Sequence, residues 1–135
     1  MPVGGLNAVD PQVKEWLEQS EYDLDTAKSL YRARRYLYTI FMCHLAIEKA
    51  LKALIVQQTG KAPPKTHNLI NLVKLGNAIL TDEQIKFVSR LSLAGVVTRY
   101  PEELKRAIAE YLRHVTRDYL THTKEVIKCL KHQIE

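Results

Sequence analysis

The sequence predicts an all-α protein, an antiparallel, up-down helical bundle of about five helices in a single domain. Three long stretches carry apolar residues at helical spacing, and shorter helical stretches lie between the second and the third. Alternating apolar and polar runs bounded by turn residues, which would indicate half-buried strands, are absent from the sequence. Residues 10–135 are expected to form the domain and residues 1–9 an N-terminal tail.

The first helix is expected from Pro11 to about Tyr31. Asp10 is a suitable N-cap, and Pro11 suits the first helical position because an N–H group there has no helical partner in any case. Apolar residues recur at helical spacing throughout this stretch: Val13, Trp16, Leu17, Leu24, Ala27, Leu30 and Tyr31. The residues 32–35 that follow are expected to form a short, basic connection.

The second helix is expected from about Tyr36 to Thr59, where Gly60 supplies a C-terminal stop and two prolines prevent continuation. A short helix is expected over Leu69–Leu75, capped by Thr66 or Asn68 and ended by Gly76.

The last third of the chain is expected to contain two helices. Thr81 and Gln84 form a capping-box pair, which opens a helix that continues through Leu91. Pro101 marks a break, because it disfavours helical dihedrals in the residue before it. From 102 to 135 there is no Gly or Pro, so one long final helix is expected.

Charge is distributed unevenly along the chain, whose net charge is +5. Residues 1–31 carry a net charge of −4, residues 32–65 carry +6, and the remainder carries +3. The basic stretch favours anionic partners such as phosphates, nucleic acid or an acidic protein face. It is equally well explained as the complement of the acidic first helix lying antiparallel beside it.

Composition excludes several classes of protein. Cys43 and Cys129 lie in apolar helical patterns without a C-x-x-C motif, which is typical of a reduced, intracellular protein. The best candidate for a membrane span is interrupted by charges of the second helix, and residues 1–9 lack the features of a secretory signal. We therefore expect a cytoplasmic protein without membrane association.

Motifs for metal and cofactor sites are missing as well. The sequence has no H-E-x-x-H motif and neither standard glycine-rich phosphate loop. Cys129 and His132 form the only compact Cys/His spacing and lack two further zinc ligands. No metal and no cofactor are expected.

Four ordered phrases identify a family resemblance. They are D-L-x-x-A from Asp23, F-M-C-H-L-A-I-E-K-A-L-K-A-L over Phe41–Leu54, P-x-x-T-H-x-L over Pro63–Leu69, and R-Y-P over Arg99–Pro101. Together they resemble the HEPN family over roughly residues 12–132, and their conjunction is more specific than any one phrase. The chain departs from the family in the turn between the first two helices, where Gly is frequent and this chain has Arg34 and Arg35.

The resemblance implies a mostly antiparallel helical bundle that is often dimeric. Family members are associated with nucleotide binding, and many act beside a small nucleotidyltransferase encoded next to them, in some cases as a toxin–antitoxin pair. A separate branch consists of metal-independent ribonuclease toxins, which use an arginine followed four to six residues later by a histidine.

His44, Glu48 and Lys52 stand four residues apart on one strip of the second helix. Glu48 and Lys52 form either a helix-stabilising pair or a polar site in which Lys52 donates to a phosphate and Glu48 orients it. The family phrase contains both residues, which favours a special role, although a buried polar contact that fixes the helix register would explain them equally well.

Two loops supply further candidates. Thr66 and His67 precede a helix start. Either both contact an anion, or Thr66 caps the helix and His67 hydrogen-bonds a neighbouring loop. Arg99 and Tyr100 precede Pro101, where they either grip phosphate and stack on a base or brace neighbouring helices.

Arg117 and His122 fit the spacing of the ribonuclease branch. Residues five apart on a continuous helix, however, point about 140° away from each other. The apolar pattern places His122 near the core and Arg117 off it, so a buried or half-buried structural histidine is expected rather than a catalytic one.

Three functions follow as hypotheses. The first is a binding module for a nucleotide (ATP or GTP), RNA or a nucleotidyltransferase, acting as a homodimer through Glu48, Lys52, His67, Arg99 and Tyr100. The second is a ribonuclease toxin using Arg117 and His122, and the third is a structural dimerisation scaffold. We expect a binding module rather than an enzyme.

Overall fold

The fold, described by a computed structural model for residues 10–97 and 101–135, is helical throughout. Its elements are α1 (Pro11–Arg32), α2 (Tyr36–Thr59), α3 (Leu69–Leu75), α4 (Asp82–Val97), α5 (Pro101–Glu110) and α6 (Arg113–Ile134). The described residues contain no strand. The all-α prediction is therefore confirmed, with six helices where about five were expected.

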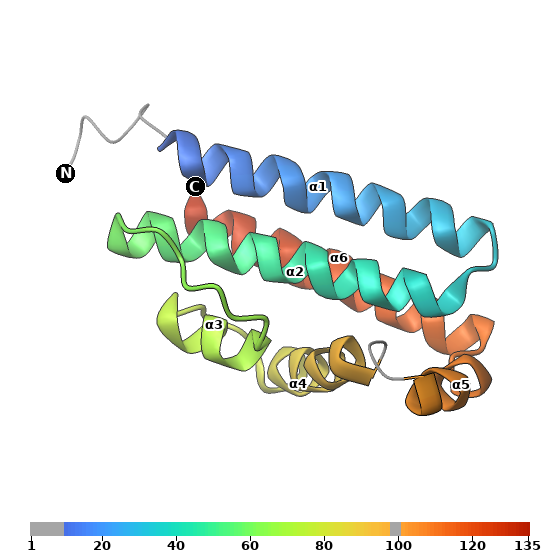
Figure 1. Ribbon diagram of the computed structural model, residues 1–135. Coiled ribbons are helices and arrows are strands. Elements are labelled where there is room, and N and C mark those ends of the chain that lie inside the picture. The colour runs from blue at the N-terminus through green and yellow to red at the C-terminus, as the bar shows by residue number, and fades with distance from the viewer. Residues whose placement is uncertain (1–9, 98–100) are drawn as a thin grey trace.

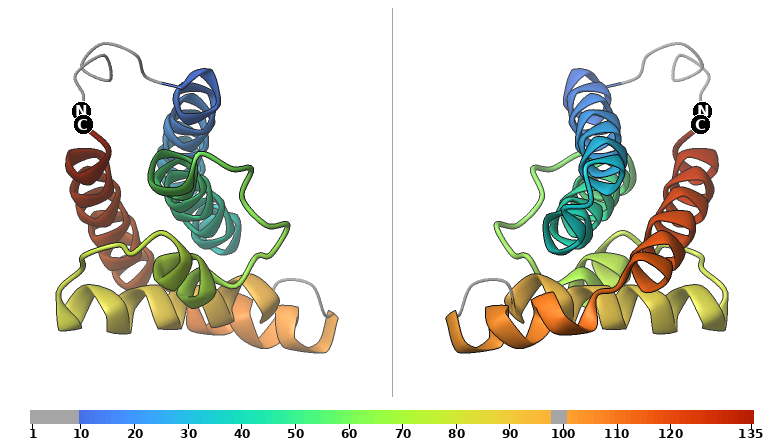
Figure 2. Two further views of the ribbon diagram at one scale, coloured as in Figure 1. Left: turned by 90° about the vertical axis from the view of Figure 1, so that its left-hand side faces the viewer. Right: turned by 90° about the vertical axis from the view of Figure 1, so that its right-hand side faces the viewer.

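Helix α2 lies at the centre of the molecule. It forms an antiparallel hairpin with α1, and α6 lies along it and runs in the same direction as α2 (Figure 1). The shorter helices α4 and α5 cross the long ones on a third side, and α3 lies beside α4, so that α3, α4 and α5 all contact α2 (Figure 2). Because it has neighbours on these sides, α2 buries 15 of its 24 residues.

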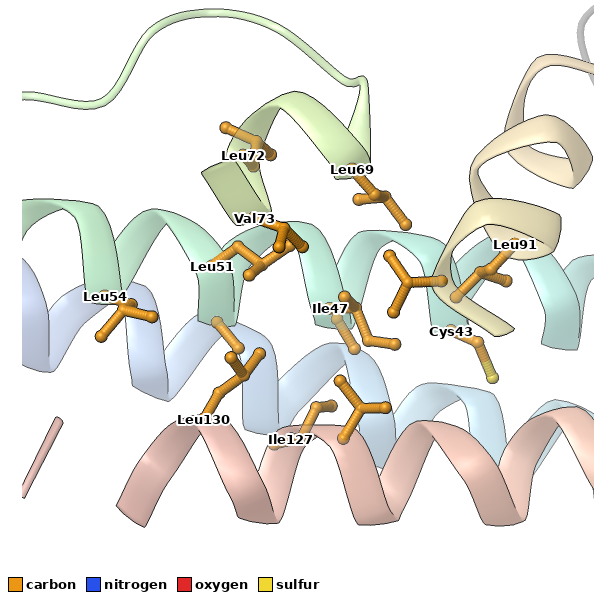
Figure 3. Packing of buried hydrophobic residues seen from close by; sticks show 14 of the residues in the cluster. Cys43, Ile47, Leu51, Leu54, Leu69, Leu72, Val73, Leu91, Ile127 and Leu130 are labelled. Atoms are coloured by element: carbon orange, nitrogen blue, oxygen red, sulfur yellow. The ribbon is translucent and has the colours of Figure 1, made fainter. Parts of the chain in front are cut away.

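The core is built from apolar side chains of α2 and its neighbours. Ile47, Leu51 and Leu54 of α2 point toward residues of α3 and α6 such as Leu69 and Leu130, and all five are fully buried (Figure 3). Each such side chain contributes about 2 kcal/mol to folding by leaving water. Packing of α2 therefore supplies much of the free energy that holds the other helices in place.

Both cysteines are free. Cys43 lies in the core, and burial raises the pKa of its thiol to about 12, so the thiol stays protonated and packs as a small apolar group.

Local signals set most helix starts. Asp10 Oδ1 accepts a hydrogen bond from the Gln12 N–H at 2.8 Å, as expected of the N-cap. The capping box forms as predicted, with reciprocal Thr81–Gln84 bonds of 2.9 and 3.1 Å. Asn68 rather than Thr66 caps α3, since its side chain accepts from the Asn71 N–H.

The prediction of one long final helix is wrong. The chain breaks between α5 and α6, where Leu112 is extended (φ −78°, ψ 169°). An unbroken helix from 102 to 135 would be about 50 Å long, whereas α2 extends for only about 36 Å. The break lets α6 run back along α2 while α5 crosses the bundle, and tertiary packing thus overrides a stretch with no local stop signal.

Three described residues have positive φ, one after each of the first three helices: Arg34 (62°), Gly60 (69°) and Asn77 (49°). Gly60 is the predicted stop. Gly76 instead serves by its small size, because an added Cβ would lie 3.2 Å from Ile55 Cγ1. Gly and Asn enter the left-handed region readily, but an arginine there is strained.

Arg34 nonetheless closes α1 with a Schellman motif. The Arg35 N–H donates to the Leu30 carbonyl at 2.8 Å, and the Arg34 N–H donates to the Tyr31 carbonyl at 3.0 Å. The sequence does not define the conformation of this turn. The structure shows that the turn has the geometry that glycine favours, with Arg34 in the left-handed position.

Replacing Arg34 by Gly is expected to stabilise the protein by about 1 kcal/mol, because it removes the strain of a left-handed arginine. Ala33→Gly is the matched control: Ala33 has an ordinary φ of −82°, so glycine there is expected to destabilise by about 0.5 kcal/mol. Urea denaturation of both variants measures the difference. A less stable Arg34→Gly variant would contradict the left-handed assignment.

Candidate functional site

Glu48 is the centre of a polar cluster formed by residues of α2 and the α2–α3 loop. The Lys52 ammonium donates to Glu48 Oε2 at 3.1 Å, and His67 Nδ1 lies 3.1 Å from both carboxylate oxygens. The side chains of Glu48 and Lys52 are buried, whereas 55% of the His67 side chain is exposed. The cluster is therefore reached from solvent through His67.

Two further groups border this cluster. His44 Nδ1 is buried and lies 3.7 Å from Glu48 Oε1. Lys52 Nζ lies 5.5 Å from the ring centroid of Trp16, at a distance typical of a cation–π contact, so α1 also contributes to the site. The predicted strip of His44, Glu48 and Lys52 does form one side of α2, and Glu48 interacts with both of the others.

The loop before α3 is held by short-range hydrogen bonds. Thr66 Oγ1 accepts from the Asn68 N–H at 3.1 Å, and Asn68 caps α3. These bonds place His67 against α2, so its partner is a helix carboxylate and not a neighbouring loop as the sequence suggested. The structure thus brings Glu48, Lys52 and His67 together, although His67 follows Glu48 by nineteen positions in the sequence.

Two predicted site residues, Arg99 and Tyr100, lie outside the described residues. Their neighbour Pro101 begins α5, as the expected helix break requires.

Arg117 and His122 lie on one continuous stretch of α6, so no local break brings their side chains together. His122 is exposed, which contradicts the expected burial, but it is engaged: Nδ1 lies 2.7 Å from the Asp118 carbonyl and the ring stacks on Phe87 at 5.2 Å. It remains at the surface because Phe87 fills the core position beneath it. Arg117 is exposed on a different side of the helix.

Part of the basic stretch does complement the acidic first helix. Lys49 lies 2.7 Å from Asp23, whose side chain is 8% exposed, across the α1–α2 contact. Glu21 of α1 similarly pairs with Lys131 of α6. Asp23 belongs to the D-L-x-x-A phrase, and this ion pair gives that aspartate a role that the sequence does not indicate.

A pocket at the α1–α2 turn was not predicted from the sequence. Arg34, Arg35, Tyr36 and Tyr38 line it together with residues of and after α5. The sequence does carry a signal for this pocket, because Tyr36 and Tyr38 follow the basic residues 32–35 at alternate positions. The basic residues by themselves indicate only a short connection between two helices.

The described part of the chain holds no group of three or more side chains suited to binding a metal ion. Across residues 10–97 and 101–135, no helix combines the length and hydropathy that a membrane span requires.

Two comparisons with known proteins give matches. The family model described as the HEPN domain matches residues 13–133. TT1696 from Thermus thermophilus, known from a crystal structure, has a similar fold with a TM-score of 0.78; the match covers 90% of this chain and 98% of TT1696. Their sequences are 19% identical, so this likeness concerns the fold alone. No curated protein matches the sequence.

Replacing Glu48 by Leu is expected to destabilise the protein by about 3 kcal/mol, because it leaves the buried Lys52 ammonium without its counter-charge. In the double variant Glu48→Leu/Lys52→Met, most of this loss should be recovered, since no unpaired charge remains. Urea denaturation of wild-type protein, both single variants and the double variant measures the coupling. Additive losses would contradict the proposed pairing.

Proposed function

The chain belongs to the HEPN family, and from this premise we propose that it is a nucleotide-binding module whose ligand contacts His67 beside Glu48 and Lys52. One observation carries the proposal: Lys52 and His67, from a helix and from a loop, converge on the same carboxylate. A buried ion pair adds little stability over an apolar pair of similar size, so such a cluster at the edge of a core is a candidate functional site.

The charges in this cluster admit an anion. Lys52 balances the Glu48 carboxylate, so the buried pair carries no net negative charge that would repel a phosphate group at His67. Because Nδ1 faces Glu48, Nε2 points away from the carboxylate; in the imidazolium form Nε2 would donate to a phosphate oxygen while Nδ1 donates to Glu48. Glu48 would fix the orientation of the imidazole, which lowers the entropic cost of binding.

Arg99 and Tyr100 are proposed to complete the site. An arginine can form two parallel hydrogen bonds to a phosphate group, and a tyrosine can stack on the base. This part of the proposal rests on the R-Y-P phrase alone.

We propose a binding module rather than a ribonuclease. In-line attack by a ribose hydroxyl needs a general base and a cation at the same phosphate. Arg117 and His122 point to different sides of one helix, and the Nδ1 contact of His122 is with a carbonyl of its own helix. Neither feature supports catalysis by this pair.

Titration calorimetry with ATP and GTP tests the nucleotide proposal. His67→Ala is expected to weaken binding about tenfold or more, which corresponds to the loss of a hydrogen bond to a charged group. His132→Ala, which removes an exposed histidine near the end of α6, is the matched control and should bind normally. The proposal fails if neither nucleotide gives heat or a thermal shift with wild-type protein, or if His67→Ala binds as wild type does.

A second candidate function, docking of a protein partner, is favoured by Ile79. Ile79 is 77% exposed, yet Gln133 holds its backbone on both sides, accepting from the N–H at 2.7 Å and donating to the carbonyl at 2.9 Å. Leu75, also half exposed, precedes it at the end of α3. A rigidly held apolar side chain at the surface suits an interface, either with a second copy of the chain or with a nucleotidyltransferase, as in a toxin–antitoxin pair or a dimeric scaffold.

We expect the homodimer to depend on this surface. Ile79→Ser should shift the protein toward monomer in light scattering across a dilution series, because it replaces the apolar contact with a hydroxyl. Leu93→Ser, which alters an exposed leucine on α4, is the control. A wild-type protein that is monomeric at every concentration would exclude self-association through Ile79, and binding to a nucleotidyltransferase would then be the remaining form of this candidate.

A further inference from the structure

A pocket lies where the α1–α2 turn faces the end of α5. Its volume is about 190 Å³, and Arg34, Arg35, Tyr36 and Tyr38 line it with Ile108 and Tyr111. We call this site the Arg–Tyr pocket. Arg35 precedes α2, and Glu48 follows thirteen residues later on the same helix, so the pocket lies about 20 Å from the His67 cluster along the α2 axis.

Positive charge concentrates at this end of the bundle. Arg34 and Arg35 are exposed, and within the described residues neither is in an ion pair. Arg113, the first residue of α6, lies near Tyr31 and near Tyr36, the first residue of α2. The N-termini of α2 and α6 therefore lie at the same end of the molecule as the C-terminus of α1 (Figure 1), so the helix dipoles partly offset one another and the arginine side chains supply the positive charge. Glu110, next to Tyr111, adds a negative charge near the pocket.

The remaining walls are aromatic. Tyr38 is 54% exposed and presents its ring at the surface. Tyr36 packs against Tyr31 with centroids 5.8 Å apart, and Tyr111 packs edge-on against Tyr119 at the same distance. These contacts hold two of the pocket tyrosines in fixed orientations, while Tyr38 is accessible for stacking.

Arg34 occupies a backbone position where glycine would be less strained. In this turn two adjacent arginines, Arg34 and Arg35, both line the same pocket. Backbone strain of this kind persists where the strained residue has a function that compensates for it. Binding to phosphate is one such function, and the arginine side chain is well suited to it.

We propose that the Arg–Tyr pocket binds single-stranded nucleic acid, with the arginines on phosphates and Tyr38 stacked on a base. The pocket is smaller than the roughly 300–1,000 Å³ that encloses a whole small-molecule ligand, so it suits one unit of an extended chain lying across the surface. Arginines that track the backbone beside exposed aromatic rings are the features that bind single strands with little dependence on sequence. This inference does not rest on nucleotide binding at His67.

Fluorescence anisotropy with labelled RNA and DNA of one sequence, about eight nucleotides long, measures the affinity at several salt concentrations. The double variant Arg34→Gly/Arg35→Ala is expected to reduce the slope of log affinity against log salt by about 1.4, or about 0.7 for each lost phosphate contact. Tyr38→Leu should weaken binding about tenfold without changing this slope, because stacking releases no counterions.

Matched controls remove equivalent side chains elsewhere. Arg90→Ala on α4 and Tyr22→Leu on α1 alter exposed residues away from the pocket and should bind as wild type does. Arg34→Gly is compatible with the fold, since it relieves backbone strain.

The comparison of RNA with DNA decides whether the sugar is recognised, and binding of either supports the proposal. Inorganic polyphosphate, which has charge but no bases, should bind more weakly and without dependence on Tyr38. The proposal is overturned if neither oligonucleotide binds at low salt, if the double arginine variant retains the wild-type affinity and slope, or if Tyr38→Leu retains the wild-type affinity.

Discussion

A helix that is covered on several sides has to bury its polar residues as well, and α2 is such a helix. Glu48 and Lys52 both lie within its buried stretch, where charged groups lose their hydration. They are tolerated because each neutralises the other and because His67 supplies a further partner to the carboxylate. Burial of α2 therefore also determines the position of the α2–α3 loop, which has to bring His67 to Glu48.

Much of the fold could be predicted from local sequence. The ends of α2 and α3 follow from Gly60 and Gly76, and the extent of each helix follows from the apolar periodicity within it. The start of α4 follows from the Thr81–Gln84 capping box. These features depend on interactions within a few residues, and a sequence displays such interactions directly. The break before α6 depends instead on the length of α2 beside it, and no residue near Leu112 signals it.

The site was predictable in composition but not in geometry. The strip of Glu48 and Lys52 on one side of α2 follows from helical spacing, and the family phrases add His67. Which groups pair cannot be read from spacing, because Glu48 and His67 meet only through the path of the intervening loop. Likewise, the left-handed conformation of Arg34 contradicts its residue type, so composition alone would have placed it in an ordinary turn.

Net charge along a segment says little about where an anion binds, and the stretch from 32 to 65 demonstrates why. Lys49 and Lys52 lie within α2 and are matched by Asp23 and Glu48, so their charge is balanced inside the protein. Arg34 and Arg35 lie in the turn before α2 and are exposed to solvent. No carboxylate follows four residues later in α2 to pair with either of them. An anion approaching this segment therefore meets positive charge at Arg34 and Arg35, unpaired among the described residues, and not at Lys49 and Lys52, because ion pairing decides which of the charges are already neutralised.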